Sequence, residues 1–500
     1  MTAPRTDALI ALLIALACFL PEVGLFGDAA LLPKCYLMAT AASLLGMKAV
    51  VRGADKRLVW KRLRQGLFAA AVGVCCWTMA EGMARGQWPV RGTFDNPAGM
   101  ALSLCCVLAL NSETPYGTEG WRRRLIIAGM AMMAMTVFAT QSRIGLIALA
   151  LLPVTNIRRH KGKAVLFLIL AVTLSAGLSL SGAKSDSTSG RLFILQRTWD
   201  MVEEHPLTGW GAGGFRRNYM LKQAAHFADH PDDRASWLAD DIRHPFCEYL
   251  LGWVDGGIAG LAICLVLFLF PVFRAKDRAL RASCLTVAIF AIASYPSYYP
   301  ISWLVLAAGW YSALRTDIPA WSHRLCIRVL CVAVCFTSVA ITFLHAYTSF
   351  RLRQAETAAQ QHQHRRALAL YASLYTLNKH NPYYLYSYSR ECYTIGLFDK
   401  ALQLNDRCHR YWSCYDMTLL RADIMYQRHD FKAAEATYQL ASQMCPVRFA
   451  PLEGLMNVYE ATGDSVKLRL TAEQVTAKPI KVPSPSVNHI KCHAMEILLP

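Results

Sequence analysis

The chain has 500 residues, of which 54% are apolar and only 17% are charged. Soluble domains are about one quarter charged, so this composition excludes an ordinary soluble enzyme. The formal net charge of +18 would favour nucleic-acid binding in a soluble chain. Here the basic residues gather in short loops between long apolar blocks, which indicates a polytopic membrane protein with no nucleic-acid partner.

The apolar blocks predict an all-α transmembrane bundle with about 11 spans. A helix needs about 20 apolar residues to cross a bilayer, so the sixth and tenth blocks are short. The first block has no convincing cleavage site and is followed by further blocks, so we expect a retained helix rather than a signal peptide. The blocks are residues 8–26, 29–51, 64–83, 97–112, 124–141, 143–156, 163–181, 248–273, 280–295, 300–314 and 326–347.

Basic residues mark alternate loops, beginning with the loop after the second block. These loops carry Arg52, Lys56, Arg57, Lys61, Arg62, Arg64; Arg122, Arg123, Arg124; Arg158, Arg159, Lys161, Lys163; Arg274, Lys276, Arg278, Arg281; Arg315 and Arg324. The loop of residues 294–300, after the ninth block, has no Lys or Arg. The positive-inside rule therefore predicts a cytoplasmic N-terminus and a C-terminus on the outer side.

Two long segments lie outside the predicted bundle of residues 1–347: a loop at 182–247 and a tail at 348–500. Loops of this length are usually functional. In the tail, residues 396–401 recur as 428–434, with Phe398 and Phe431 separated by 33 positions, and a weaker copy follows at 463–466. This period resembles tetratricopeptide repeats, so we expect a helical repeat domain.

Short motifs follow one another in a fixed order through the bundle and the long loop. They include a Ser-Arg-x-Gly turn and a His-Pro-Leu-x-Gly-x-Gly segment, and they stand at residues 94–99, 141–145, 189–199, 204–215, 244–250 and 255–261. This ordered set resembles the O-antigen ligase and polymerase superfamily, which includes bacterial O-linked oligosaccharyltransferases. The resemblance covers about residues 90 to 265.

The resemblance implies a multi-pass enzyme of the bacterial inner membrane with a periplasmic C-terminal domain. It implies transfer of a glycan from undecaprenyl diphosphate to an acceptor hydroxyl, on lipid A core or on a protein, without a cofactor. A polymerase, which extends another glycan, shares this scaffold. A non-catalytic scaffold that recruits partners is the alternative from another class. The repeat tail favours a protein partner, because such repeats present concave binding surfaces.

The diphosphate leaving group requires fixed positive charge, and the resemblance places Arg143 and Arg191 in this role. Arginine suits it because its planar guanidinium binds phosphate in a bidentate manner and stays charged. The alternative for Arg143 is an interfacial anchor, and for Arg191 a solvated loop charge. No cluster of metal-ligating residues is evident in the sequence, so we expect metal-independent chemistry.

The general base is the point at which the sequence departs from the family pattern. Phe246 and Cys247 stand where the family has His and Asn, and a histidine occurs two residues earlier, at His244. On a helix His244 and Glu248 would face one way, so we predict them as the catalytic pair. The alternative is an interfacial histidine.

Three further features of the outer segments allow only local predictions. The Gly209-x-Gly211-x-Gly213 run favours a tight turn over a nucleotide loop, because no strand precedes it. We interpret Asp240 and Asp241 as solvated loop charges rather than as acceptor-binding groups. Cys408 and Cys414 would both lie in an oxidising compartment, but their spacing does not establish a disulfide.

Overall fold

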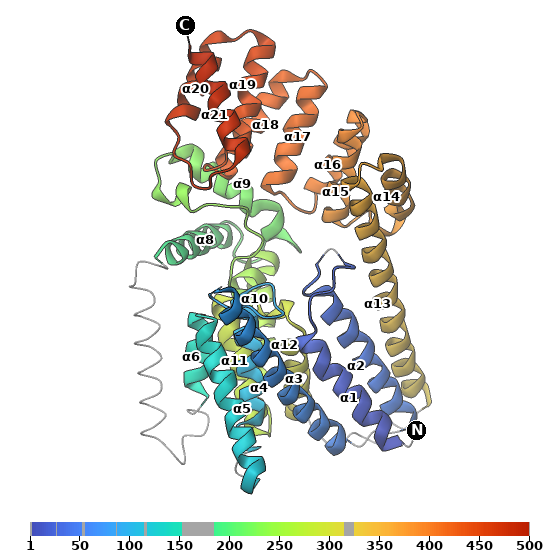
Figure 1. Ribbon diagram of the computed structural model, residues 1–500. Coiled ribbons are helices and arrows are strands. Elements are labelled where there is room, and N and C mark those ends of the chain that lie inside the picture. Colours follow the sequence, from blue (N-terminus) through green and yellow to red (C-terminus); the bar gives the residue numbers. More distant parts are fainter. Residues whose placement is uncertain are drawn as a thin grey trace. The chain divides into compact units, whose positions relative to one another are not determined.

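The computed structural model describes residues 3–26, 28–52, 56–86, 88–114, 118–152, 185–314 and 325–499. These residues form 20 α-helices and no β-strand (Figure 1), which confirms the all-α fold class for this part of the chain. The chain divides into two compact units. Unit 1 comprises Met1–Ser181, Phe246–Tyr249 and Ala262–Arg353, and unit 2 comprises Gly182–Pro245, Leu250–Leu261 and Gln354–Pro500.

Unit 1 is a bundle of helices that coincide with ten of the eleven predicted spans. They are α1 (Ala3–Phe19), α2 (Leu32–Arg52), α3 (Lys56–Arg85), α4 (Pro97–Asn111), α5 (Gly120–Ala139), α6 (Arg143–Leu151), α11 (Arg278–Ala293), α12 (Pro300–Ala313) and parts of α10 (Glu248–Arg274) and α13 (Leu325–Gln360). The seventh predicted span, residues 163–181, lies outside the described residues.

Within the described residues, three helices are long and apolar enough to cross a membrane. These segments are Arg57–Arg85, Glu248–Arg274 and Arg328–Gln360, and the apolar helices Thr6–Phe19 and Pro97–Asn111 are shorter. The helices therefore support a membrane protein, while the count of 11 spans stays a prediction.

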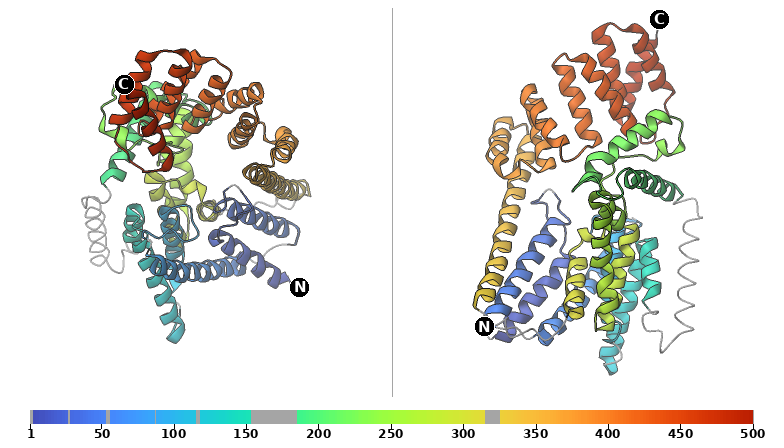
Figure 2. Two further views of the ribbon diagram at one scale, coloured as in Figure 1. Left: turned by 45° about the horizontal axis from the view of Figure 1, so that its top comes forward. Right: turned by 180° about the vertical axis from the view of Figure 1, so that it is seen from behind.

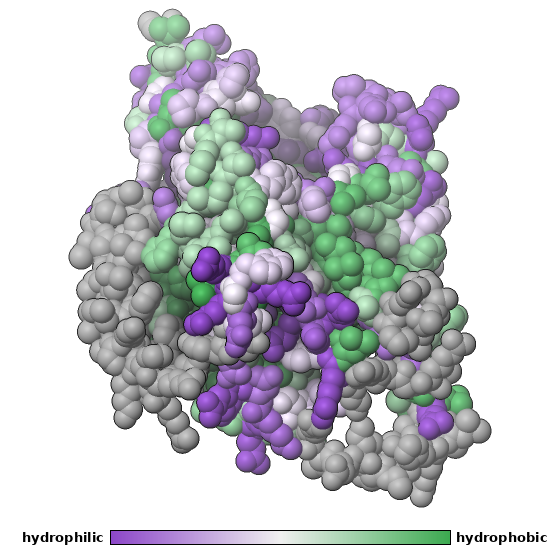
Figure 3. All heavy atoms as spheres, turned by 60° about the horizontal axis from the view of Figure 1, so that its bottom comes forward, coloured by the Kyte–Doolittle hydropathy of each residue, from purple (hydrophilic) through white to green (hydrophobic). Residues whose placement is uncertain are grey.

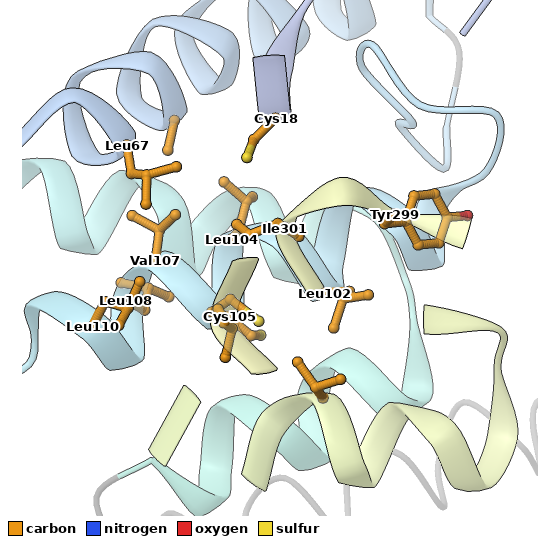
Figure 4. Packing of buried hydrophobic residues seen from close by; sticks show 14 of the residues in the cluster. Cys18, Leu67, Leu102, Leu104, Cys105, Val107, Leu108, Leu110, Tyr299 and Ile301 are labelled. Atoms are coloured by element: carbon orange, nitrogen blue, oxygen red, sulfur yellow. The ribbon is translucent and has the colours of Figure 1, made fainter. Parts of the chain in front are cut away.

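Helix α4 forms the core of unit 1, and every residue from Gly99 to Asn111 is buried. A helix that is apolar on all sides requires neighbours on all sides, and α4 packs against α3, α5, α6, α11 and α12. Figure 4 shows α4 side chains such as Leu104 and Val107 among Cys18, Leu67 and Ile301 of other helices. This packing fixes both ends of α4, where motif residues lie.

The end of unit 1 that holds the N-terminus also holds the basic starts of two helices. Helix α3 begins there with Lys56 and Arg57, and α5 begins there with Arg122–Arg124 close to its first residue (Figure 1). Figure 3 views this end and shows hydrophilic side chains gathered on it. The arrangement agrees with two of the predicted basic loops.

A topology test follows from this arrangement. A reporter that is active only outside the cytoplasm should work when fused after Gly190 or Thr348 and should fail after Arg57 or Arg278, because basic loops remain inside. Enzyme activity of each fusion, normalised to its amount in the membrane, gives the measurement. An inactive fusion at Thr348 alone would indicate one miscounted span, whereas activity at Arg57 would contradict the predicted orientation.

Unit 2 combines the long loop with the tail. The loop contributes α8 (Ser185–Glu204), α9 (Gly214–Asp229) and a short 3-10 helix at Arg234–Trp237. Successive tail helices pack against each other (Figure 2). They are α14 (His364–Asn378), α15 (Pro382–Thr394), α16 (Phe398–His409), α17 (Tyr415–Gln427), α18 (Phe431–Met444), α19 (Ala450–Thr462), α20 (Ser465–Ala477) and α21 (Pro485–Leu498).

A backbone feature recurs in the tail with the period found in the sequence. His362, Gly396, His429 and Gly463 all have positive φ angles, and they stand 34, 33 and 34 residues apart. Each lies in the turn between two helices. The turn at His362 is a fourth copy that the sequence pattern missed, because His364 stands where the recognised copies have Phe398 and Phe431. The spacing supports a repeat tail, and its tetratricopeptide class stays a prediction.

Cys408 and Cys414 do not form a disulfide in the structure; both are free and buried. The Cys408 thiol instead lies 3.1 Å from the carbonyl oxygen of Pro382 and 3.1 Å from the sulfur of Met417. Cysteine here packs as a small apolar side chain in the repeat core.

Candidate functional site

The Ser-Arg-x-Gly turn places Arg143 at the start of α6. The Ser142 hydroxyl accepts a hydrogen bond from the Gly145 N–H at 3.2 Å and so caps the helix. A side chain at position 145 would not fit, because a Cβ there would lie 2.7 Å from the Cβ of Ala101 on α4. The turn therefore seats α6 on the core helix and leaves Arg143 partly exposed in its first turn.

The Asn-Pro-x-Gly motif at the start of α4 is the point at which residues 294–300 attach. The Asn96 side chain caps α4 through the Gly99 N–H at 2.9 Å, and its amide donates to the hydroxyls of Tyr295 and Tyr299. The Tyr299 hydroxyl donates in turn to Asp95 at 2.8 Å. This polar cluster ties the entrance of α4 to a segment about 200 positions later in the chain.

Glu248, the predicted partner of the base, is bonded to the same segment of unit 1. Its carboxylate accepts hydrogen bonds from the backbone N–H of Ser297, at 3.2 Å, and from the Ser297 hydroxyl. Only 8% of Glu248 is exposed. The Phe246 ring lies 5.9 Å from the Tyr295 ring. Glu248 therefore holds residues 294–300 in place at the start of α10.

The glycine run after α8 packs against an interruption in α10, both within unit 2. Gly209, Gly211 and Gly213 all have positive φ angles, which confirms the predicted tight turn. Gly257 also has a positive φ angle inside α10. A Cβ on Gly209 would lie 2.5 Å from the nitrogen of Gly257, so the backbones of two motifs that are distant in sequence pack directly against each other.

Asp255 of α10 caps the helix that follows this turn. Its two carboxylate oxygens accept hydrogen bonds from the N–H groups of Gly213, at 3.1 Å, and Phe215, at 3.0 Å. A carboxylate thus occupies the N-terminus of α9, where a nucleotide loop would bind phosphate. Arg217 donates to the Trp210 carbonyl at 2.9 Å, which gives that arginine a structural role in the turn.

His244 lies in unit 2, in an irregular segment and not on a helix. The prediction that His244 and Glu248 share one helix face is therefore wrong. Helix α10 begins only at Glu248, because Pro245 disfavours helical geometry for the residue before it and Phe246 has a positive φ angle. Burial, together with the positive charges of Arg216 and Arg243, lowers the pKa of His244 to about 4. Its imidazole is therefore neutral at physiological pH, and the same low pKa makes it a weak proton acceptor.

The residues just before His244 are held by the repeat tail. The Arg243 guanidinium lies 5.7 Å from the Tyr383 ring and 5.3 Å from the Trp412 ring, distances typical of cation–π contacts. Asp240 forms an ion pair with Arg448 of the tail at 2.8 Å. Each of these contacts lies within unit 2.

Backbone and amide hydrogen bonds complete this attachment. The buried amide of Gln223 donates to the carbonyl oxygens of Asp240, at 3.2 Å, and Met444, at 2.7 Å. The Asp241 carboxylate accepts from the Tyr415 N–H at 3.3 Å, and burial raises its pKa. The interpretation of Asp241 as a solvated charge is therefore wrong, whereas Asp240 is exposed as predicted and forms a surface ion pair with the tail.

Arg191 is an exposed residue of the first half of α8. It therefore lies in a helix and not in a loop. The buried side of α8 packs through Phe193, whose ring stacks on that of Phe227 of α9 at 5.2 Å. Of the predicted site residues, Arg143 and Glu248 belong to unit 1, and Arg191 and His244 belong to unit 2.

Sequence reasoning missed the residues that brace the motifs. Tyr295, Ser297 and Tyr299 bond to motif residues of α4 and α10, and Asp255 caps α9. The sequence signal for this role is the aromatic composition of residues 294–300, which contain three tyrosines.

One comparison with known proteins gives a match. A family model described as O-Antigen ligase matches residues 128–265, a segment that contains all four predicted site residues and excludes the repeat tail. No curated protein and no solved structure matches the chain. The members of the matched family are membrane glycosyltransferase-like enzymes. The match shows that residues 128–265 are similar to the O-antigen ligase family, which supports the resemblance found in the sequence.

Proposed function

We propose that this protein transfers a glycan from undecaprenyl diphosphate to an acceptor hydroxyl at the periplasmic face of the bacterial inner membrane. It would act as an O-antigen ligase or a protein O-oligosaccharyltransferase. The observation that carries the proposal is the position of Arg143 within the matched segment, in the first turn of α6. The guanidinium of Arg143 stays charged at any working pH and is able to bind phosphate in a bidentate manner, which suits the diphosphate of the donor.

The proposed reaction is a direct displacement at the anomeric carbon. The acceptor oxygen forms a bond to this carbon, the bond to the diphosphate oxygen breaks, and undecaprenyl diphosphate leaves with the bonding electrons. Arg143 and Arg191 stabilise the negative charge that develops on the leaving group. The acceptor hydroxyl loses its proton to the neutral imidazole of His244, whose low pKa keeps it unprotonated.

Glu248 has a different role in this proposal from the one predicted. Its carboxylate is buried and accepts two hydrogen bonds from Ser297, so it positions residues 294–300 and does not need to exchange a proton. It stays the alternative base if His244 proves dispensable, because it lies only four residues further along the chain.

One observation favours the non-catalytic alternative. Phe246 stands where the resemblance would place the catalytic histidine, and its apolar ring packs near Tyr295. A scaffold without transferase activity would tolerate this exchange. A polymerase would require no different geometry, since the other glycan chain supplies the hydroxyl.

The decisive experiment compares lipid-linked glycan in cells with and without the gene. The proposal requires undecaprenyl-linked glycan to accumulate on deletion, together with loss of sugar from lipid A core or from a protein. Loss of long glycan chains with retention of short ones would identify a polymerase, and no accumulation would support the scaffold.

Purified enzyme should keep its activity in EDTA, because arginines and not a metal ion hold the phosphates. Activity that requires Mg²⁺ would contradict this mechanism.

The contacts of the tail with the loop indicate that the tail also positions His244. Gln223→Ala should loosen this attachment, because it removes one buried and one partly buried hydrogen bond to carbonyl oxygens, at a cost of about 1–3 kcal/mol. We expect faster protease cleavage between residues 229 and 243 and slower transfer, even to a small soluble acceptor. Gln439→Ala on the exposed side of α18 is the matched control. Unchanged cleavage and transfer in Gln223→Ala would leave the tail a recruiting role only.

A further inference from the structure

Unit 1 contains a polar cavity that the reaction above does not use. Its volume is about 330 Å³, and it lies where the turn after α1, the C-terminal part of α3 and the loop before α4 meet. Glu22, Trp77, Glu81, Arg85 and Arg91 line it. Small-molecule sites in proteins have volumes of roughly 300–1,000 Å³, so this cavity suits a compact ligand.

The charges around the cavity indicate which ligand chemistry fits. Glu81 and Arg85 form an ion pair at 2.8 Å, and Glu22 and Arg91 add one further charge of each sign. This balanced set favours neither a phosphate nor a cation. It supplies hydrogen-bond acceptors and donors side by side, which matches sugar hydroxyls, because each of these both donates and accepts.

An exposed aromatic ring adds a second feature of carbohydrate binding. Trp77 lines the cavity and is 49% exposed, and an accessible indole ring is able to pack against the apolar side of a sugar ring. Two lining threonines, Thr78 and Thr93, are buried, and their hydroxyls have no hydrogen-bond partner among the described residues. Both hydroxyl oxygens are inaccessible to solvent, so these threonines form the wall behind the cavity and do not contact a ligand in it.

The wall of the cavity is fixed to the segment that carries Arg143. The Val90 N–H donates to the carbonyl oxygen of Ala139, the last residue of α5, at 3.3 Å. Arg143 follows four positions later, at the start of α6. The Thr93 carbonyl accepts a hydrogen bond from the buried ammonium of Lys34, which fixes the loop from its other side.

We propose that this cavity is a subsite for an uncharged sugar ring of one of the glycans that take part in the transfer at Arg143. The inference rests on the proposed function, and it names the class of ligand that unit 1 selects. A sugar of the donor glycan and a sugar of a glycan acceptor offer the same chemistry. Trp77 provides the stacking face, and the Glu81–Arg85 pair binds the ring hydroxyls.

The test measures binding to the full-length protein in nanodiscs. The probes are undecaprenyl diphosphate and undecaprenyl diphosphate that carries one N-acetylglucosamine. The wild type should bind the sugar-bearing lipid on the order of tenfold more tightly, because the sugar ring adds a stacking contact and hydrogen bonds in the cavity. Trp77→Ala and Glu81→Gln should remove this preference and leave the affinity for the bare lipid unchanged. Trp121→Ala is the matched control, because this tryptophan is 67% exposed at the start of α5.

A second arm distinguishes the two sources of the sugar. If Trp77→Ala instead weakens binding of a soluble, deacylated core oligosaccharide, the subsite holds the acceptor's sugar. Equal affinity of the wild type for both lipids, with no effect of Trp77→Ala on the oligosaccharide, would overturn the subsite. A preference that survives in Trp77→Ala and Glu81→Gln would overturn it as well. Sugar-dependent binding without any glycan transfer would instead refute the proposed function and leave the subsite intact.

Discussion

Replacement of Arg143 or Arg191 by alanine is expected to lower the rate of glycan transfer on the order of 10²–10³-fold, the usual cost of one preorganised charge contact at a leaving group. The leaving group must be stabilised whichever base operates, so the two arginines should matter in every version of the mechanism. Initial rates with purified enzyme and saturating donor give the measurement.

Lysine variants separate charge from geometry at the same positions. Arg143→Lys and Arg191→Lys should recover only part of the rate, because an ammonium keeps the charge but lacks the bidentate fork. Arg124→Ala, in the first part of α5, and Arg469→Ala, which pairs with Glu473 on α20, are the matched controls. Wild-type rates in both alanine variants of Arg143 and Arg191 would disprove the site.

The positions of the helices of unit 1 could be predicted from the sequence because each helix contains a continuous block of apolar residues. The ends were less accurate where polar residues continue a helix. The block at 326–347 ends where the continuous apolar run ends, whereas α13 continues to Gln360 through a segment that contains Leu, Arg, Gln, Ala and Glu residues, all of which favour helix. The block at 64–83 likewise became the longer α3, because Lys, Arg and Leu precede it.

The motifs were recognisable in the sequence, but their contacts were not. A local pattern shows that Asn96 caps a helix, yet the contact of Asn96 with Tyr299 joins residues 203 positions apart. The attachment of Asp240 to Arg448 spans 208 positions. Hydrophobic periodicity reports which side of a helix is buried and does not identify the partner. The low pKa of His244 depends on burial and on its spatial neighbours Arg216 and Arg243, so it could not be predicted from the sequence alone.

His244→Ala should lower kcat by roughly 10²–10⁴-fold if the imidazole is the general base. The pH profile gives the sharper result. A base must be unprotonated, and burial with the charges of Arg216 and Arg243 lowers the pKa of His244 to about 4. Activity should therefore stay level as the pH falls through 6.5, and it should decline only as the pH approaches 4.

Variants of the neighbouring charges test whether that acid limb belongs to His244. Arg243→Ala removes one nearby positive charge, so the pKa should rise and the decline should begin at higher pH. Folding must be followed in parallel, since the unfolded histidine binds a proton below about 6.5 and the native state then loses stability as the pH falls towards 4. Arg390→Ala on α15, where the guanidinium lies near Tyr386, is the matched control. If transfer by the folded wild type halves near pH 6.5, or if His244→Ala keeps its full rate, another group takes the proton, and Glu248→Gln becomes the variant to measure.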